Sequence, residues 1–311
     1  MAGKFIALRR CAGLSGKRWG KKQVNNPTPN ITIPVELTNP GQFFACCGLL
    51  ELADRLWAGS EGWFERRHFC IVTSDSAKTL QTILTETQTL TFDVGGDDES
   101  DGAEDDDKQD SESAQPIELQ WGNGRAAIYL DWWSDKTIKP WAGSMNERVI
   151  LRAMLSAIDP TNADPFNDLR RVQYQSPKFG KNGRPKKPQK KEPFYFDPRR
   201  GNKSHPLDCG FSPDTHKMES ECCPALEALC FIGLQRARPA ASGTANQSRY
   251  TVWTRHSSTG PGLPANLVGA VTCGIVPWPS LDNYVFDNYF RTDQRKHKTF
   301  SQATLERNNH G

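Results

Sequence analysis

The chain has 311 residues, of which 36% are hydrophobic, and it carries a formal net charge of +3. This length is enough for one large domain or two ordinary ones, each with a substantial core. No apolar run approaches the roughly 20 residues of a membrane-spanning helix, and the basic N-terminal stretch lacks the apolar region of a secretory signal. We therefore expect a cytoplasmic protein.

The charge is divided unevenly along the sequence. Residues 93–113 hold eleven acidic residues against one lysine, a balance of −10, so the rest of the chain carries +13. Such a polar tract cannot bury enough apolar surface to fold, and we expect residues 93–115 to form a disordered acidic loop. The basic remainder favours nucleic acid as a partner.

The nine cysteines include two adjacent pairs and have apolar neighbours, a pattern typical of reduced, buried thiols in the cytoplasm. Cys209, Cys222 and Cys223 lie near His205 and His216 in the sequence, but no CxxC or HxxxH spacing is present. We therefore expect no metal site and no cofactor. The motifs G-x-S-x-G, HExxH and the P-loop are also missing, which favours a binding protein over an enzyme.

Residues 1–30 combine basic side chains with Gly, Ser and Pro and show no periodicity, so we expect a flexible basic arm. Two interpretations stay open for this arm: an extension without a role, or a tail that holds a phosphate backbone.

The chain is organised around residues 34–57, PVELTNPGQFFACCGLLELADRLW. Val35 and Leu37 alternate with polar residues as in a half-buried strand, and two apolar faces in the following segment predict a buried helix. The turn before the helix places Asn39 and Gln42 where backbone N–H groups and the helix dipole favour a phosphate or a base. Anchoring in the core is the favoured interpretation of both residues.

Further elements are predicted up to residue 160. The first two are a strand at 64–73 and a helix from cap residues at 74–76 to about Glu86. An antiparallel hairpin follows, formed by IELQW and RAAIYLDWW around Gly122-Asn123-Gly124. The last is a helix over ERVILRAMLSAI that ends at Asp159-Pro160. Four tryptophans gather around the hairpin: Trp121, Trp132, Trp133 and Trp141. Core packing is the default for them, and the alternative is an exposed tryptophan beside Lys136 and Lys139 that stacks on an unpaired base.

The first candidate for nucleic-acid contact is residues 177–193, PKFGKNGRPKKPQKKEP, a flexible basic loop. Lysines that meet phosphates release counterions, so binding should weaken steeply with salt. The loop also carries side chains that match base edges, arginine for guanine and asparagine for adenine. A solvated surface loop is the alternative. The predicted contacts are Lys178, Lys181, Asn182, Arg184, Lys186, Lys187, Lys190 and Lys191.

A short strand at 194–196 is followed by the loop DPRRGNKSHPLDCGFSPD, the second candidate for nucleic-acid contact. Arg199, Arg200 and Lys203 cluster in it, and the guanidinium fork matches phosphate and guanine. Ion pairs with Asp197 or other acidic residues of the loop are the alternative.

The remaining chain is predicted to form a helix from Pro224 through ALEALCFIGLQRAR and strands at 249–254 and 267–275. The last segment, YVFDNYFRTDQRKHKTF, interleaves basic residues with aromatic ones, which suits a nucleic-acid surface but also a solvated edge. Its predicted contacts are Arg291, Arg295, Lys296 and Lys298. Together these elements predict an α+β fold with mainly antiparallel sheets and a few packed helices in two lobes. The lobes span residues 31–160, with the acidic loop, and 161–311, with the basic loop.

Three segments, NPGQFFACCGLLELADRLW, FYFDPRRGNKSHPLDCGFSPD and FRTDQRKHKTF, resemble the small Cas8-like subunit of type I-U (I-G) CRISPR effector complexes. The resemblance implies a Cascade subunit at the 5′ handle of the crRNA, alongside Cas7-like, Cas5-like and Cas6-like subunits. Such a subunit binds target double-stranded DNA, recognises the protospacer-adjacent motif, promotes R-loop formation and contacts the Cas3 helicase-nuclease. The alternatives are a structural crRNA-binding subunit and a crRNA-processing endoribonuclease.

Overall fold

A computed structural model gives the fold, and it describes residues 28–92, 116–122, 127–134, 137–141, 147–172, 195–199, 221–257, 260–290 and 298–306. Residues 1–27 of the predicted arm, the acidic loop 93–115 and the basic loop 177–193 lie outside the described residues. The described part contains both α-helices and antiparallel sheets, which confirms the predicted α+β class.

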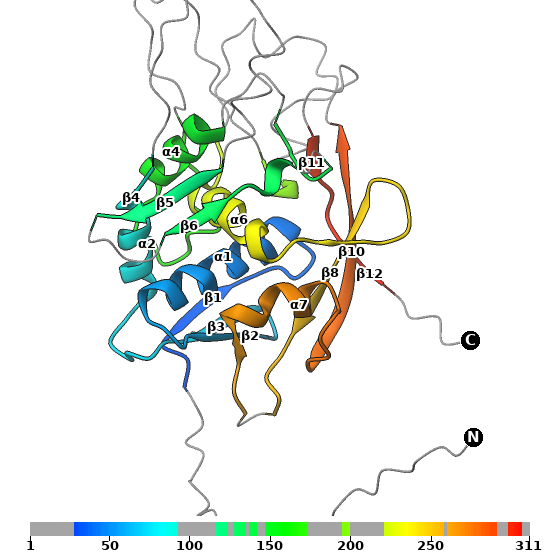
Figure 1. The fold of residues 1–311 in the computed structure, drawn as a ribbon, viewed down its shortest axis with the longest axis horizontal. Coiled ribbons are helices and arrows are strands. Elements are labelled where there is room, and N and C mark those ends of the chain that lie inside the picture. The colour runs from blue at the N-terminus through cyan, green and yellow to red at the C-terminus, as the bar shows by residue number, and fades with distance from the viewer. Residues whose placement is uncertain are drawn as a thin grey trace, which may run out of the picture.

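The centre of the fold is a pair of helices, α1 (Pro40–Leu56) and α6 (Pro224–Arg236), which lie side by side in the middle of Figure 1. Every residue of α1 from Pro40 to Ala53 is buried, as is every residue of α6 from Pro224 to Leu234. A helix that is apolar all round must be covered on all sides. The predictions of both helices, and of a buried first helix, are confirmed.

A four-stranded sheet of order β1-β3-β2-β9 covers one side of this pair. Its strands are β1 (Ile31–Pro34), β2 (Glu61–Glu65), β3 (His68–Val72) and β9 (Leu263–Pro264). The single strand predicted at 64–73 is wrong, because the chain turns at Arg66, whose φ of 55° is left-handed, and pairs Phe64 with Phe69. The Arg-Arg-His cluster in the sequence therefore marks the turn of a hairpin.

A second sheet has the order β11-β10-β8-β7, with β12 also paired to β10. Its strands are β7 (Ala240–Ala241), β8 (Gln247–Trp253), β10 (Ser280–Phe290), β11 (Lys298–Phe300) and β12 (Thr304–Leu305). Phe43 of α1 stacks on Tyr250 of β8 at 4.3 Å between ring centroids and meets Trp253 edge-on at 5.7 Å. Aromatic rings thus join this sheet to α1.

A third sheet, β4-β5-β6, packs with α2 and α4 on the other side of the central helices in Figure 1. These elements are β4 (Leu90–Thr91), β5 (Ile117–Trp121), β6 (Ile128–Leu130), α2 (Leu80–Gln88) and α4 (Glu147–Ala157). The predicted hairpin is confirmed, with Ile117 opposite Leu130 and Leu119 opposite Ile128. Helix α2 begins later than predicted, because Thr79 supplies its N-terminal cap instead of residues 74–76.

The tryptophans of this region are core residues. Trp132 and Trp133 lie in a 3-10 turn, η1 (Trp132–Ser134), and Trp121, Trp132, Trp133 and Trp141 are each 3% exposed or less. The indole N–H of Trp132 donates to the Phe231 carbonyl of α6 at 2.8 Å. The default interpretation is confirmed, and base stacking by an exposed tryptophan of this group is ruled out.

Two other predicted strands are wrong. Leu267 ends η2 (Ala265–Leu267), residues 268–272 form the helix α7 (Val268–Thr272), and a turn follows; Gly269 of this helix lies against the Arg236 carbonyl, where a side chain would not fit. Residues 195–196 of the strand predicted at 194–196 are irregular; buried Glu227 of α6, instead of a neighbouring strand, accepts the N–H of Phe196 at 2.7 Å.

The buried apolar residues form one connected cluster that includes α1, α4, α6 and all three sheets. The largest helix contact, α1 against α6, joins residues from the two predicted lobes, so the two-lobe arrangement is not confirmed. Among the described helices, none combines the length and hydropathy that crossing a membrane would require.

Candidate nucleic-acid interface

Three stretches far apart in the sequence meet at the start of α1. The Asn39 side chain donates to the Asp197 carboxylate at 2.9 Å, and the backbone N–H of Ala303 donates to the Thr38 carbonyl at 2.7 Å. The ring of Phe300 on β11 lies 5.4 Å from that of Phe196. These stretches belong to or adjoin the three segments that carry the resemblance described above.

Asn39 and Gln42 are fixed by the polypeptide itself. Asn39 is the N-terminal cap of α1, and its side-chain oxygen accepts the N–H of Gln42 at 3.1 Å. The Gln42 side-chain oxygen in turn accepts the N–H of Glu36 at 2.6 Å. Both side chains are buried, at 1% and 2% exposure, which confirms core anchoring as their structural role. Their predicted contact with nucleic acid stays a prediction.

The Arg199 guanidinium is held by four acceptor atoms from three residues. Its guanidinium forms a bidentate ion pair with Asp197, with Nε 2.9 Å from Oδ1 and Nη2 2.7 Å from Oδ2. Nη1 donates to the side chain of Asn167 at 2.5 Å, and Nη2 donates to the Phe166 carbonyl at 2.7 Å. Burial works against the charged form, but hydrogen bonding and the charge of Asp197 raise the pKa of Arg199.

Asp197 is fully buried, so its charge must be compensated inside the protein. Arg199 and Asn39 both supply that compensation, and the Asp197 oxygen Oδ1 also accepts the backbone N–H of Arg199 at 3.0 Å. The ion pair was the alternative interpretation of this loop, and it is present. Whether Arg199 also contacts nucleic acid stays a prediction.

A cavity of about 300 Å³ opens beside this ion pair, and we call it the α1-entry cavity. It is lined by Glu36, Asn39, Pro198, Arg199, Tyr289, Ser301 and Gln302. Its volume is at the lower end of the range for small-molecule sites. Two of the predicted contact residues, Asn39 and Arg199, meet here although 160 positions separate them in the sequence.

Glu36, Ser301 and Gln302 were not singled out in the sequence, and Tyr289 was noted only as one of the aromatic residues interleaved with basic ones in the last segment. Tyr289 lies two residues before Arg291 of the basic C-terminal segment, and this proximity was the available signal. Ser301 and Gln302 follow β11, and their position depends on the pairing of β11 with β10. Gln302 is fixed by its own amide, which donates to the Thr38 hydroxyl at 3.2 Å.

Lys298 is the other predicted contact that the structure describes. It lies at the start of β11, where its backbone N–H donates to the Pro140 carbonyl and its ammonium donates to the Thr137 carbonyl at 3.3 Å. It does not line the α1-entry cavity. The remaining predicted contacts lie outside the described residues: Lys178, Lys181, Asn182, Arg184, Lys186, Lys187, Lys190, Lys191, Arg200, Lys203, Arg291, Arg295 and Lys296.

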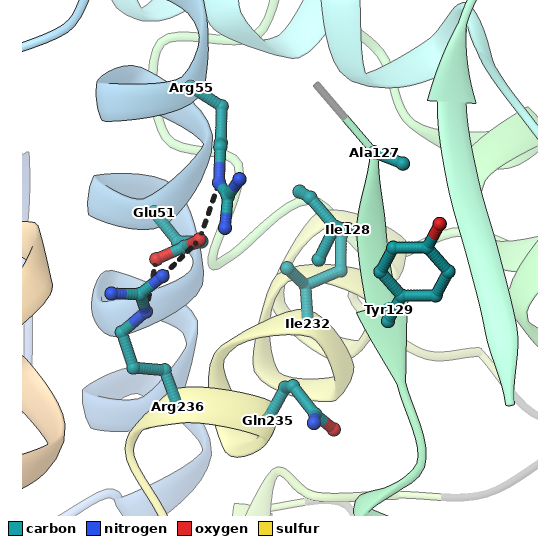
Figure 2. A pocket seen from close by; sticks show the side chains of 8 residues that line it. All are labelled: Glu51, Arg55, Ala127, Ile128, Tyr129, Ile232, Gln235 and Arg236. Atoms are coloured by element: carbon teal, nitrogen blue, oxygen red, sulfur yellow. Dashed lines mark hydrogen bonds and ion pairs between the residues drawn. The ribbon is translucent and has the colours of Figure 1, made fainter.

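A second cavity, of about 450 Å³, lies between α1, α6 and β6 (Figure 2). Glu51 of α1 occupies one wall, where it pairs with Arg55 at 2.8 Å and with Arg236 of α6 at 2.6 Å. Ile128 and Ile232 supply apolar walls. The Glu51–Arg236 pair joins the two central helices, the Glu51–Arg55 pair lies within α1, and we assign both a structural role.

Within the described residues, no group of three or more His, Cys, Asp or Glu side chains is placed to hold a metal ion. His205, His216 and Cys209, which raised the question of zinc in the sequence, lie outside that part of the chain.

Comparisons of the chain with protein-family models, with curated proteins and with solved structures give no significant match. The resemblance to a Cas8-like subunit therefore rests on the three segments alone.

Proposed function

We propose that this protein is the Cas8-like subunit of a type I CRISPR surveillance complex. In this role it binds target DNA, recognises the protospacer-adjacent motif, promotes R-loop formation and helps to recruit the Cas3 helicase-nuclease. One observation carries the proposal: the described residues of the three segments that resemble this family, among them Asn39, Asp197 and Phe300, lie together around the start of α1 although they are distant in the sequence.

The charge distribution supports nucleic acid as the partner. Outside the acidic tract the chain carries +13, and phosphate contacts dominate the affinity of proteins for nucleic acid. In this function the cations hold the backbone and a few side chains test base identity. The partners are the crRNA, the target duplex and the other Cascade subunits.

The decisive experiment is a gel shift of the assembled complex, with and without this subunit, on target duplexes that carry randomised flanking bases. We expect binding to depend on the subunit and to select a short flanking motif. Binding and selection that persist without the subunit would contradict the proposal. They would favour the alternatives, a structural crRNA-binding subunit or a crRNA-processing endoribonuclease.

The basic loop at 177–193 gives a second test in the same assay. Charge reversal of Lys186, Lys187, Lys190 and Lys191 should weaken DNA binding and flatten its dependence on salt, because fewer counterions are released. The thermal unfolding midpoint of the variant, measured in parallel, should match that of the unchanged protein. Unchanged affinity at moderate salt would exclude this loop as a contact.

A further inference from the structure

The α1-entry cavity has a charge that does not suit a phosphate. Among the described residues, its charged lining groups are Glu36 and Arg199, and Arg199 is paired with Asp197. These two carboxylates and one guanidinium sum to −1. A phosphate would be repelled by this negative charge, and the Arg199 guanidinium already forms a bidentate pair with Asp197. Electrostatics therefore favour a neutral group that donates hydrogen bonds.

The polar groups of the cavity include both acceptors and donors. The exposed Glu36 carboxylate can accept two hydrogen bonds, and its charge acts on Arg199, which also lines the cavity. Arg199 has five N–H donors, of which the contacts with Asp197, Asn167 and Phe166 use four. The fifth, on Nη1, has no hydrogen-bond partner among the described residues.

The cavity also has an aromatic wall. Tyr289 near the end of β10 is half-buried and lines it, and Pro198 contributes a second apolar surface. Aromatic side chains are the usual stacking surface for an unstacked nucleobase. A double helix cannot enter a cavity of about 300 Å³, whereas a single base can.

We infer that the α1-entry cavity binds one unstacked guanine base of a single-stranded nucleic acid. The inference rests on the proposed function and names the ligand of this site. The Glu36 carboxylate accepts the N1–H and N2–H groups of the base, and the remaining Arg199 N–H donates to O6. Adenine presents the unprotonated N1 to the carboxylate, and cytosine and uracil each offer a single donor beside an acceptor, so guanine is preferred.

Fluorescence anisotropy of the purified full chain tests the inference. The probes are labelled oligouridines that carry one central guanine, adenine or cytosine, together with the unmodified oligouridine. We expect roughly tenfold tighter binding of the guanine probe, since a good bidentate pair discriminates by about this factor. Glu36→Gln should reduce the preference to less than about threefold, because an amide offers the base one acceptor and one donor.

The variant preserves the local fold, because Glu36 is exposed and its hydrogen bond to Gln42 comes from the backbone N–H. Glu221→Gln is the matched control, since Glu221 is exposed and does not line the cavity. It should keep the guanine preference.

Equal binding of all probes, or a guanine preference that survives Glu36→Gln, would overturn the inference. In that case the gel shift of the assembled complex still decides the proposed function independently. Absence of binding to every oligonucleotide at low salt would overturn the inference as well. If that gel shift also fails, the proposed function falls with it.

Discussion

Gly48 of α1 and Gly233 of α6 face each other across the closest approach of the two central helices. A Cβ on Gly48 would lie 2.0 Å from the Leu229 carbonyl oxygen, and one on Gly233 would lie 2.0 Å from the Phe44 carbonyl oxygen. Because these oxygens belong to helix backbones, neither can move without displacing its helix. The fold therefore requires a hydrogen in place of a side chain at both positions.

Gly48→Ala should lower the free energy of unfolding by about 3 kcal/mol, because overpacking at a rigid contact forces the two helices apart. Alanine raises intrinsic helix propensity by roughly 1 kcal/mol, so the measured loss is net of that gain. Urea denaturation followed by circular dichroism measures the change.

Gly122→Ala is the control for this variant. A Cβ at Gly122 would meet no atom within 4 Å, so the free energy of unfolding should change little. If Gly48→Ala were as stable as Gly122→Ala, the close packing of α1 on α6 would be wrong.

The second prediction concerns the hydrogen bond from Asn39 to the buried Asp197. Asn39→Ser keeps an oxygen that can cap α1 but removes the amide donor. We expect a loss of about 1–3 kcal/mol, since a buried charged acceptor loses a partner. Asn39→Asp should cost more at neutral pH, because it places a second carboxylate beside Asp197. Urea denaturation of the three proteins measures both effects.

Thr79→Ala is the reference variant, because it removes a helix cap that makes no hydrogen bond to a buried carboxylate. Thr79 caps α2 at the protein surface, and its removal should cost about 1 kcal/mol. If Asn39→Ser cost less than Thr79→Ala, the bond to Asp197 would be of little importance to the fold.

The central helices were predictable because apolar residues recur in both at helical spacing, in α1 on two neighbouring faces, a pattern typical of a buried helix. The error at 267–275 has a different origin. Val268 and Val271 favour a strand by intrinsic propensity, but in the structure they are buried on one short helix that packs through Gly269 against the Arg236 carbonyl of α6. That constraint is tertiary, and no local pattern expresses it.

In the candidate site too, residue types could be recognised in the sequence, whereas tertiary contacts could not. Asn39 and Arg199 stood out by residue type, and the sequence allowed an ion pair between Arg199 and Asp197. Glu36 and Gln302 did not stand out, because a polar residue beside a strand is common and only the packing of β11 against the start of α1 makes these two line a cavity. Spacing in the sequence carries no information on such a contact.

The third prediction is a pH dependence that arises from Glu147. Its side chain is 1% exposed at the start of α4, and Oε2 accepts no hydrogen bond from the described residues. Burial raises the pKa of Glu147 above 4.5, although Lys139 and Arg148 oppose the shift. As the pH rises through 4.5, the unfolded chain releases this proton before the folded protein does, so the free energy of unfolding falls.

Glu147→Gln should remove this loss. The variant and the unchanged protein should be similarly stable below pH 4.5, where Glu147 is protonated in both states. Above the raised pKa of the folded protein, the variant should be the more stable of the two. Urea denaturation across this pH range measures the difference in the free energy of unfolding between the two proteins. The contributions of the other titrating groups cancel in this difference. A difference that does not change with pH would contradict the prediction.

The fourth prediction concerns thiol reactivity. Burial raises the pKa of Cys46, Cys47 and Cys230 well above 9.0, and the thiolate is the reactive form. Cys273 is only half-buried. In the native protein, iodoacetamide should therefore modify Cys273 at least about tenfold faster than the three buried thiols. Mass spectrometry of the peptides after timed quenching measures each rate, and in urea all four should react at similar rates. Equally rapid native modification of Cys47 and Cys230, which lie near each other on α1 and α6, would mean that the two helices separate readily, which would contradict the tight packing at Gly48.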